Sequence, residues 1–260
     1  MSRITDAFRG TKAFIPFITC GDPDIEMSEK LVAAMCESGA DIVELGLPFS
    51  DPIAEGPVIQ GADERALASG TTTDKVFDMV ARLRKSIDTP FIIMTYANPV
   101  FVYGCNRFME RCKATGVDGI IIPDVPYEER ETFLPYSRKH GIELISMIAP
   151  TSEDRIYEIA SQAEGFLYCV SSLGVTGMRT SFSAGISDMI AKVKKVNPAL
   201  PCAVGFGVSK PEHSTSMARI ADGVIVGSAI VNIIAEHSYD AEEYVREYVR
   251  SMKSAALAAL

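Results

Sequence analysis

The sequence has no tryptophan, only three histidines and no pair of cysteines at metal-ligand spacing. Its six cysteines are scattered through apolar stretches, without a C-x-x-C motif and without a histidine at ligand distance along the chain. We therefore expect reduced thiols and no metal site. The histidines lie in polar stretches, so histidine-based catalysis is not expected either.

Basic residues and long apolar runs are also scarce. The 260 residues include 25 Lys plus Arg against 34 Asp plus Glu, a formal net charge of −9. Nucleic-acid binding needs clustered basic residues, and a membrane helix needs about 20 consecutive apolar residues; neither is present. The first ten residues lack the apolar segment of a secretory signal. We expect a cytoplasmic protein with neither a nucleic-acid nor a membrane partner.

What the sequence does contain is an eightfold alternation of short β-branched runs with longer segments of helical periodicity. Apolar residues recur at i, i+3, i+4 and i+7 between the runs, as in Lys30–Cys36 and Asp154–Ala160. Continuous apolar runs are typical of a parallel sheet covered on both faces. The predicted strands are Ala13–Thr19, Asp41–Leu45, Phe91–Thr95, Gly119–Ile122, Glu143–Ile148, Phe166–Val170, Pro201–Val204 and Gly223–Val226.

Eight such units predict an α/β protein, a single (β/α)8 TIM barrel domain over residues 1–260, with no linker that would divide it. A doubly wound open sheet is the alternative. We expect Ser2–Arg9 to form a small helix at the bottom of the barrel and Ala241–Ala259 to form the last outer helix. Three glycines are expected to end helices in the left-handed conformation: Gly39, Gly116 and Gly141.

Catalytic residues of such barrels lie where the strands run into the following loops. The loop after the second strand, from Glu44 to Pro57, carries three carboxylates and several prolines, which indicates a stiff functional loop. The loop after the sixth strand, Ser171–Gly177, is rich in glycine and long enough for a lid.

Small residues follow the seventh and eighth strands, in Gly205-Phe206-Gly207 and in Gly227-Ser228. They allow backbone N–H groups to approach an anion, and Ser228 is expected to cap a helix whose N-terminus attracts negative charge. This pattern predicts a phosphate site after strands seven and eight. The alternative is that these glycines only form tight turns.

Glu44 is the first candidate for catalysis. Strand alternation places Ile42 and Glu44 on the inner side of the barrel and Val43 and Leu45 on the outer side. Burial of a carboxyl raises its pKa, so this group is expected to hold and release a proton near neutrality. The alternative is a structural carboxylate paired with a base from a loop, since no strand contains Lys, Arg or His.

No predicted strand ends in a lysine, and the histidines do not form a cluster. The sequence therefore predicts neither a Schiff base nor a bound metal that could act as an electron sink. If a bond to carbon is cleaved, the substrate itself must accept the electrons. An electron-rich ring becomes such a sink when it is protonated, so we expect a phosphorylated small molecule that carries one.

The motifs resemble one family over essentially the whole chain. The segments that carry the resemblance are Phe14–Pro23, Glu44–Pro57, Gly174-Val175-Thr176-Gly177 and Gly205-Phe206-Gly207. They are similar to the corresponding segments of the tryptophan synthase α subunit. The resemblance implies reversible cleavage of indole-3-glycerol phosphate to indole and glyceraldehyde 3-phosphate, without a cofactor in this chain.

By this resemblance Glu44 is the general acid and base, and Glu55 holds the indole N–H. Asp51 and Asp124 are expected to anchor loops. The residues implied in substrate binding are Phe17, Tyr96, Ile121 and Tyr168 in the ring and glycerol pocket, Thr176 on the lid, and Gly177, Phe206, Gly207, Gly227 and Ser228 around the phosphate.

Two positions depart from the family pattern. Glu55 stands where the family usually has Asp, and the extra methylene adds roughly 1.3–1.5 Å of reach. A misplacement of about 1 Å can cost on the order of 100-fold in rate, so slow turnover or a compensating shift of the loop is expected. Ser171-Ser172-Leu173 departs from the expected Ser-Arg-Ala, which concerns the lid.

The resemblance also implies a partner, the tryptophan synthase β subunit, in an α2β2 heterotetramer. That subunit uses pyridoxal phosphate to join indole with serine. Leu47, Pro48 and Phe49 are either part of the docking face or packed beneath their own loop.

Three functions therefore compete. The first is a lyase that works with its β subunit, and the second is a weakly catalytic regulatory subunit that activates the partner. The third is another phosphate-binding barrel enzyme, such as a sugar-phosphate isomerase.

Overall fold

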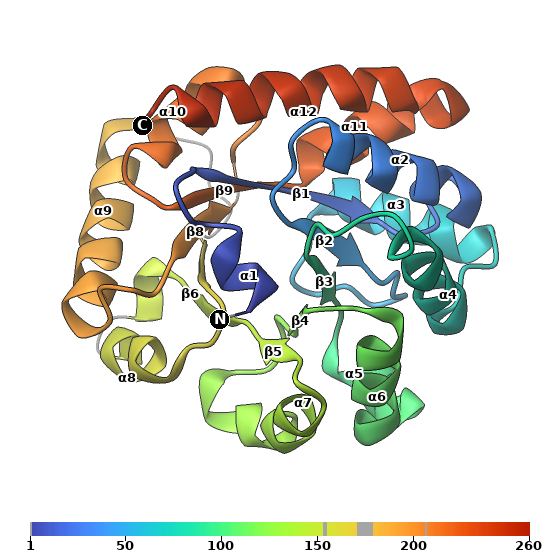
Figure 1. Ribbon diagram of the computed structural model, residues 1–260, viewed down its shortest axis with the longest axis horizontal. Helices are drawn as coiled ribbons and strands as arrows, with labels where there is room; N and C mark the ends of the chain where they lie inside the picture. The colour runs from blue at the N-terminus through green and yellow to red at the C-terminus, as the bar shows by residue number, and fades with distance from the viewer. Residues whose placement is uncertain (1, 153–154, 171–178, 206) are drawn as a thin grey trace.

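In the computed structural model, short parallel strands form a barrel and helices form a ring around it (Figure 1). The structure describes residues 2–152, 155–170, 179–205 and 207–260, and in 179–184 it describes the backbone alone. No helix of these described residues is both long and apolar enough to cross a membrane.

The strands confirm the eightfold alternation. Seven of the eight predicted strands are each observed as one strand, with ends shifted by at most two residues. The predicted strand Glu143–Ile148 is instead split in two at Ile145. The strands are β1 (Ala13–Thr19), β2 (Val43–Gly46), β3 (Phe91–Met94), β4 (Gly119–Ile121), β5 (Glu143–Leu144), β6 (Ser146–Ile148), β7 (Leu167–Val170), β8 (Cys202–Gly205) and β9 (Gly223–Val226).

The split strand closes the ring. The hydrogen-bonded order is β5-β4-β3-β2-β1-β9-β8-β7-β6, and every pairing is parallel. Because β5 pairs with β4 while β6 pairs with β7, one continuous stretch of chain changes neighbours at Ile145. The barrel is therefore a (β/α)8 barrel, and the doubly wound alternative is wrong.

The helices cover the outside of the barrel (Figure 1). The predicted last helix is observed as α12, and the three predicted left-handed glycines have φ of +104°, +88° and +71° at Gly39, Gly116 and Gly141. The helices are α1 (Arg3–Asp6), α2 (Ile25–Glu37), α3 (Pro57–Ala68), α4 (Thr73–Leu83), α5 (Ala97–Tyr103), α6 (Cys105–Thr115), η1 (Tyr127–Thr132), α7 (Leu134–His140), η2 (Pro150–Ser152), α8 (Arg155–Gln162), α9 (Arg179–Val196), α10 (Pro211–Ala218), α11 (Ser228–His237), η3 (Ser238–Asp240) and α12 (Ala241–Leu257).

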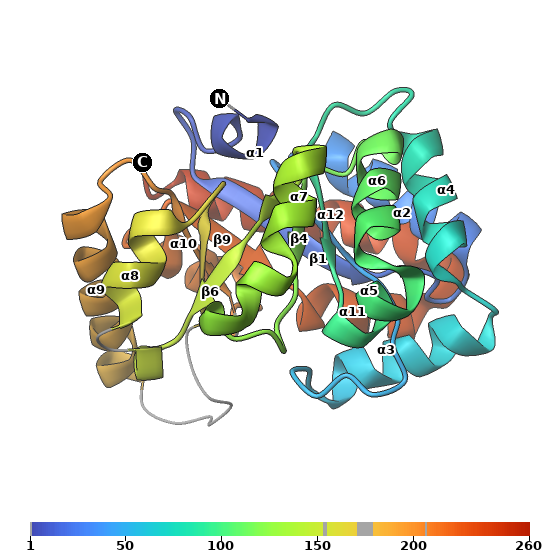
Figure 2. The same ribbon diagram turned by 90° about the horizontal axis from the view of Figure 1, so that it is seen from below.

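Helix α1 closes the N-terminal end of the barrel. It is shorter than the predicted Ser2–Arg9, because Ser2 is its N-cap and the regular helix ends at Asp6. Its Ile4 is fully buried in the cluster of side chains that fills the barrel interior. Figure 2 shows α1 and α3 at opposite ends of the molecule. The end of the barrel that α1 closes is therefore separate from the end that carries the loop before α3.

Two layers of apolar side chains hold the barrel together. Ile42 belongs to the interior cluster, whereas Val43 and Leu45 belong to the layer between the sheet and the helices. The predicted alternation along β2 is therefore confirmed, and Glu44, the next inward position after Ile42, is 2% exposed.

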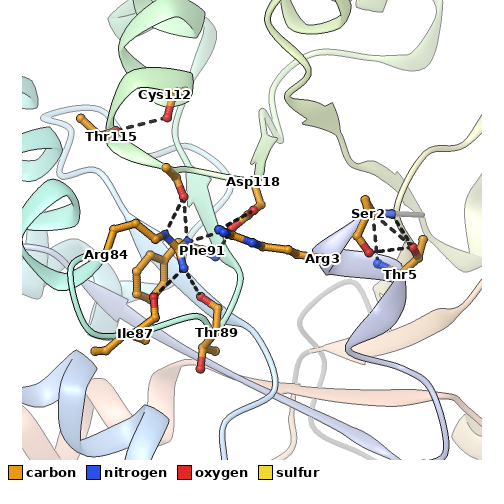
Figure 3. A network of polar contacts seen from close by, with 11 residues as sticks. Ser2, Arg3, Thr5, Arg84, Ile87, Thr89, Phe91, Cys112, Thr115 and Asp118 are labelled. Atoms are coloured by element: carbon orange, nitrogen blue, oxygen red, sulfur yellow. Dashed lines mark hydrogen bonds and ion pairs between the residues drawn. The ribbon is translucent and has the colours of Figure 1, made fainter.

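Three aspartates at the starts of strands repeat one local arrangement. Asp41, Asp118 and Asp222 each accept a hydrogen bond from the backbone N–H of a residue in the adjacent strand, at 2.7–2.9 Å. Each also pairs with a basic side chain, respectively Lys253, Arg84 and Lys194. Figure 3 shows Asp118 with Arg84 and the N–H of Phe91, and with Arg3 reaching it from α1.

Candidate active site

Glu44 lies inside the barrel, among apolar neighbours. The parallel register places it beside Phe17 on β1 and beside Ile92 on β3. Burial raises the pKa of the Glu44 carboxyl from 4.5 to about 8. The carboxyl can therefore both give and take a proton near neutral pH, as the sequence predicted.

The side chains that surround Glu44 in the barrel interior come from several strands. Phe17, Ile121 and Tyr168 all belong to the buried interior cluster, and the buried Glu44 is the register neighbour of Phe17. Burial and the charge of Glu44 raise the pKa of the Tyr168 hydroxyl, which therefore stays protonated. The structure thus brings together Glu44 and three of the residues expected to surround the substrate ring.

Two glycines make room for the aromatic rings. A Cβ atom at Gly46 would lie 2.6 Å from the Phe17 ring, and one at Gly205 would lie 2.6 Å from the Tyr168 hydroxyl. Because any larger residue would displace a ring, glycine at these strand ends allows the Phe17 and Tyr168 rings to lie where they do.

Tyr96 ends the segment after β3 and is almost fully buried. Its ring packs against Phe49 at a centroid distance of 5.3 Å, and its hydroxyl accepts a hydrogen bond of 3.1 Å from the Ala54 N–H. Tyr96 therefore ties the loop after β2 to the segment that follows β3.

Glu55 lies in this loop and is half-buried. The Glu55 N–H donates to the Pro52 carbonyl at 3.2 Å, and the Gln60 side chain donates to the Glu55 carbonyl at 2.9 Å. Burial, and then the adjacent Asp63 carboxyl, raise the pKa of Glu55. The charge of Glu44 contributes to the same shift, so the two predicted catalytic carboxyls lie close enough for their charges to interact.

Asp63 is a site residue that the sequence did not reveal. It lies on α3, is 4% exposed, and lies close enough to the Glu55 carboxyl for the two groups to shift each other's pKa. The available signal was its place between Ala62 and Ala66, which lie on the same buried face of the helix. An acid at a core-facing helix position is rare unless it is paired.

The predicted phosphate site is described in part. Gly207 follows β8 with φ of +75° and no atom within 4 Å of a Cβ at its position. The prediction that Ser228 caps α11 is wrong, because Gly227 is the N-cap and Ser228 is the first helical residue. The N–H groups of a first helical turn have no partner within the helix, so they remain suited to an anion.

Gly227 also joins the two halves of the site. A Cβ at Gly227 would lie 3.3 Å from the Phe17 ring, so the N-terminus of α11 adjoins the ring that lies beside Glu44. Phe206, Thr176, Gly177 and the rest of the loop 171–178 lie outside the described residues.

The two expected anchoring aspartates differ in their contacts. Asp124 accepts hydrogen bonds of 3.0 and 3.2 Å from the Ala97 N–H and so holds the start of α5. Asp51 is exposed and accepts a hydrogen bond only from its neighbour Ser50 among the described side-chain contacts.

The apolar residues Leu47, Pro48 and Phe49 of the loop after β2 are packed against the protein rather than exposed to solvent. Leu47 and Pro48 are buried and Phe49 packs on Tyr96, which agrees with the alternative that these residues pack within their own loop. Exposed apolar side chains occur later in this loop and on α5: Ile53 is 80% exposed, Phe101 51% and Val102 81%.

Comparison with known proteins places the chain in one family. The family model "Tryptophan synthase alpha chain" matches residues 5–259. The tryptophan synthase alpha chain of Lacticaseibacillus casei is 47% identical over 255 residues, which cover 98% of this chain and 96% of the relative.

Solved structures agree with this result. The crystal structure of tryptophan synthase subunit alpha from Legionella pneumophila has a TM-score of 0.90 at 38% identity and covers 98% of each chain. A chain of the tryptophan synthase complex from Pyrococcus furiosus has a TM-score of 0.83 at 34% identity, with 93% of this chain and 98% of that chain covered. The chain has a strand-end carboxyl in an apolar barrel and small residues after β8 and β9. Together with these matches, those features show that the chain belongs to the tryptophan synthase alpha-chain family.

Proposed function

We propose that this chain binds indole-3-glycerol phosphate at the C-terminal mouth of the barrel and that Glu44 catalyses its cleavage. Chains of this family are lyases of tryptophan biosynthesis, and the products are indole and glyceraldehyde 3-phosphate. The observation that carries the mechanism is the buried Glu44 carboxyl, whose pKa is raised to about 8 beside the Phe17 ring. Its place next to the N-terminus of α11 suits a substrate with a ring at one end and a phosphate at the other.

In the first step, protonated Glu44 gives its proton to the ring carbon that bears the glycerol chain. Positive charge then develops on the ring, and the Glu55 carboxylate holds the ring N–H. The ionised Glu44 next takes the proton of the hydroxyl on the adjacent glycerol carbon. As the carbon–carbon bond breaks, its electrons return to the ring, an aldehyde forms and Glu44 is protonated again.

The remaining residues bind and orient the substrate in this proposal. Phe17, Tyr96, Ile121 and Tyr168 surround the ring and the glycerol chain, and Thr176 closes the lid. The phosphate is held by Gly177, Phe206, Gly207, Gly227 and Ser228, chiefly through backbone N–H groups.

The partner in this proposal is the tryptophan synthase β subunit, with pyridoxal phosphate in that subunit and no cofactor in this chain. The docking face is the exposed apolar group of Ile53, Phe101 and Val102, since large apolar side chains exposed together mark interaction sites. The α2β2 assembly then forms in the cytoplasm, where reducing conditions agree with six free cysteines.

The test of the proposed lyase is release of indole from indole-3-glycerol phosphate by the purified full chain, with and without the β subunit. Glu44→Gln should lower kcat by about 10²–10⁴-fold with little change in KM, because the amide cannot transfer a proton. Glu129→Gln on the exposed surface should keep the full rate. If Glu44→Gln keeps full activity, the assignment of Glu44 is wrong.

The same assay separates the lyase from its alternatives. The regulatory reading is favoured by one observation, the long Glu55 side chain that pairs with Asp63. If Glu55→Asp raises a barely detectable rate by orders of magnitude, the wild-type chain is a regulatory subunit. Conversion of an aminoaldose phosphate with no action on the indole substrate would instead identify a sugar-phosphate isomerase.

A further inference from the structure

Glu55 is paired with a second buried acid. Helix α3 starts at Pro57, two residues after Glu55, and Asp63 projects from its buried face. Asp63 is 4% exposed, and its carboxyl lies close enough to the Glu55 carboxyl for the two groups to shift each other's pKa. The two side chains therefore meet at the mouth of the barrel, one from the loop and one from the helix.

No base neutralises this pair among the residues that the structure describes. The titratable groups that interact electrostatically with Glu55 are Asp63, Glu44, Tyr96 and Tyr168. Asp22 and Cys20 interact in the same way with Asp63. The nearest arginine in this network, Arg65, is already bound to Asp22 through contacts of 2.8 and 2.7 Å.

The hydrogen-bond donors around the pair are distributed unequally. The Phe49 backbone N–H and the Thr19 hydroxyl lie near Asp63, and both lower the pKa of its carboxyl against the effect of burial. The buried Oε2 atom of Glu55 accepts none from the donors of the described residues. Ionised carboxylates only accept hydrogen bonds, so a bond between two carboxyls requires a proton on one of them. The donors at Asp63 favour its charged form, which leaves the proton on Glu55.

We propose that Asp63 is a positioning residue for the lyase reaction. Its carboxylate accepts a hydrogen bond from protonated Glu55 and so fixes where the Glu55 side chain lies. It also controls the pH at which Glu55 carries the negative charge that the ring N–H needs. The proposal rests on the proposed function of Glu55. It also gives the longer Glu55 side chain a role, because its added reach is directed at Asp63. Burial and the negative charge of Asp63 both raise the pKa of Glu55, which agrees with this role.

The kinetic test compares kcat of the full chain and of Asp63→Asn between pH 6 and pH 9. The amide is nearly isosteric, carries no charge and can donate to Glu55, so Glu55 should ionise at lower pH. The ratio of the Asp63→Asn rate to the wild-type rate should rise as the pH falls, by up to about tenfold for each pH unit by which the Glu55 ionisation moves.

Taking the ratio removes the titration of the substrate phosphate, which is the same for both proteins. The matched control is Asp78→Asn on the surface of α4, whose ratio to the wild type should not vary with pH. If the ratio for Asp63→Asn is also independent of pH, Asp63 has only a structural role and the proposal is overturned.

A second measurement does not depend on catalysis. Unfolding in urea is compared for the wild type, Asp63→Asn, Glu55→Gln and the double variant, at pH 5.5 and pH 9. The coupling between positions 55 and 63 should be stabilising at pH 5.5, where a proton lies between the carboxyls, and destabilising at pH 9, where both are ionised. Equal coupling at the two pH values would contradict the proposal.

The two measurements separate this proposal from the proposed function. If the coupling changes sign but wild-type protein releases no indole, the lyase function fails and the shared proton stands. If indole is released and depends on Glu44, while the rate ratio and the coupling are independent of pH, the lyase stands and the role of Asp63 is wrong.

Discussion

At the scale of single residues, the site depends on acids that are kept away from water and from bases. Glu44 could be predicted because strand alternation fixes its inward direction and no basic residue occurs in any strand. Glu55 followed only from the family resemblance, since a loop residue has no periodicity that reports its direction. Asp63 was missed because helix periodicity indicates which face of α3 is buried, but does not show that an acid on that face lies beside Glu55.

The raised pKa of Glu44 predicts a cost in stability. The pKa rises from 4.5 in the unfolded chain to about 8 in the folded one, so between these values the folded state holds a proton that the unfolded state has released. This contribution to the free energy of unfolding is full below pH 4.5 and is lost as the pH rises through about 8.

Glu44→Gln does not titrate, so it should be more stable than wild type at pH 9 and similar at pH 5. The difference between the two pH values should be a few kcal/mol, since one pKa unit corresponds to about 1.4 kcal/mol. Urea unfolding at both pH values measures it, and Glu129→Gln serves as the exposed control. A Glu44→Gln variant that is no more stable at pH 9 than at pH 5, relative to wild type, would show that Glu44 is not held in a dry site.

At the scale of elements, the starts of strands are fixed by paired aspartates and their ends by glycines. The Gly-x-Asp signature before two of these strands was visible in the sequence, but the bases that pair with the aspartates were not, because Lys253 and Arg84 come from distant helix ends. The split at Ile145 was also hidden, since an apolar run indicates burial and not the neighbour with which a strand pairs.

This arrangement predicts that Asp118→Ala lowers the free energy of unfolding by about 2–4 kcal/mol. The change leaves the mostly buried Arg84 guanidinium without its carboxylate and the Phe91 N–H without its acceptor. Asp78→Ala breaks a more exposed ion pair with Arg111 and should cost only about 0–1 kcal/mol. Equal losses in urea unfolding for the two variants would contradict the structural role of Asp118.

At the scale of the whole molecule, the end of the barrel closed by α1 and the end that carries the candidate active site lie opposite each other (Figure 2). The eightfold alternation was enough to predict this division, because all parallel strands point the same way. The exact shape of the mouth was not predictable, since it depends on contacts between distant segments such as Gly227 and Phe17 or Ala54 and Tyr96.

The division predicts that Ile4→Ala destabilises the chain without changing substrate binding. Ile4 is fully buried at the bottom of the barrel, where a Cβ at Gly119 or Gly165 would lie 2.9 or 3.2 Å from its side chain. Truncation should cost about 2–4 kcal/mol in urea unfolding, and KM for indole-3-glycerol phosphate should stay the same. A large rise in KM in the folded variant would mean that the two ends are coupled.

The central claim is that Glu44 is a dry acid able to exchange its proton near neutral pH. It is tested most directly by a carbon-13 NMR titration of the full chain with labelled glutamate side-chain carboxyls, in which the Glu44 signal is the one missing from Glu44→Gln. The account predicts a midpoint near pH 8 for this signal. A midpoint near the ordinary value of 4.5 would contradict it.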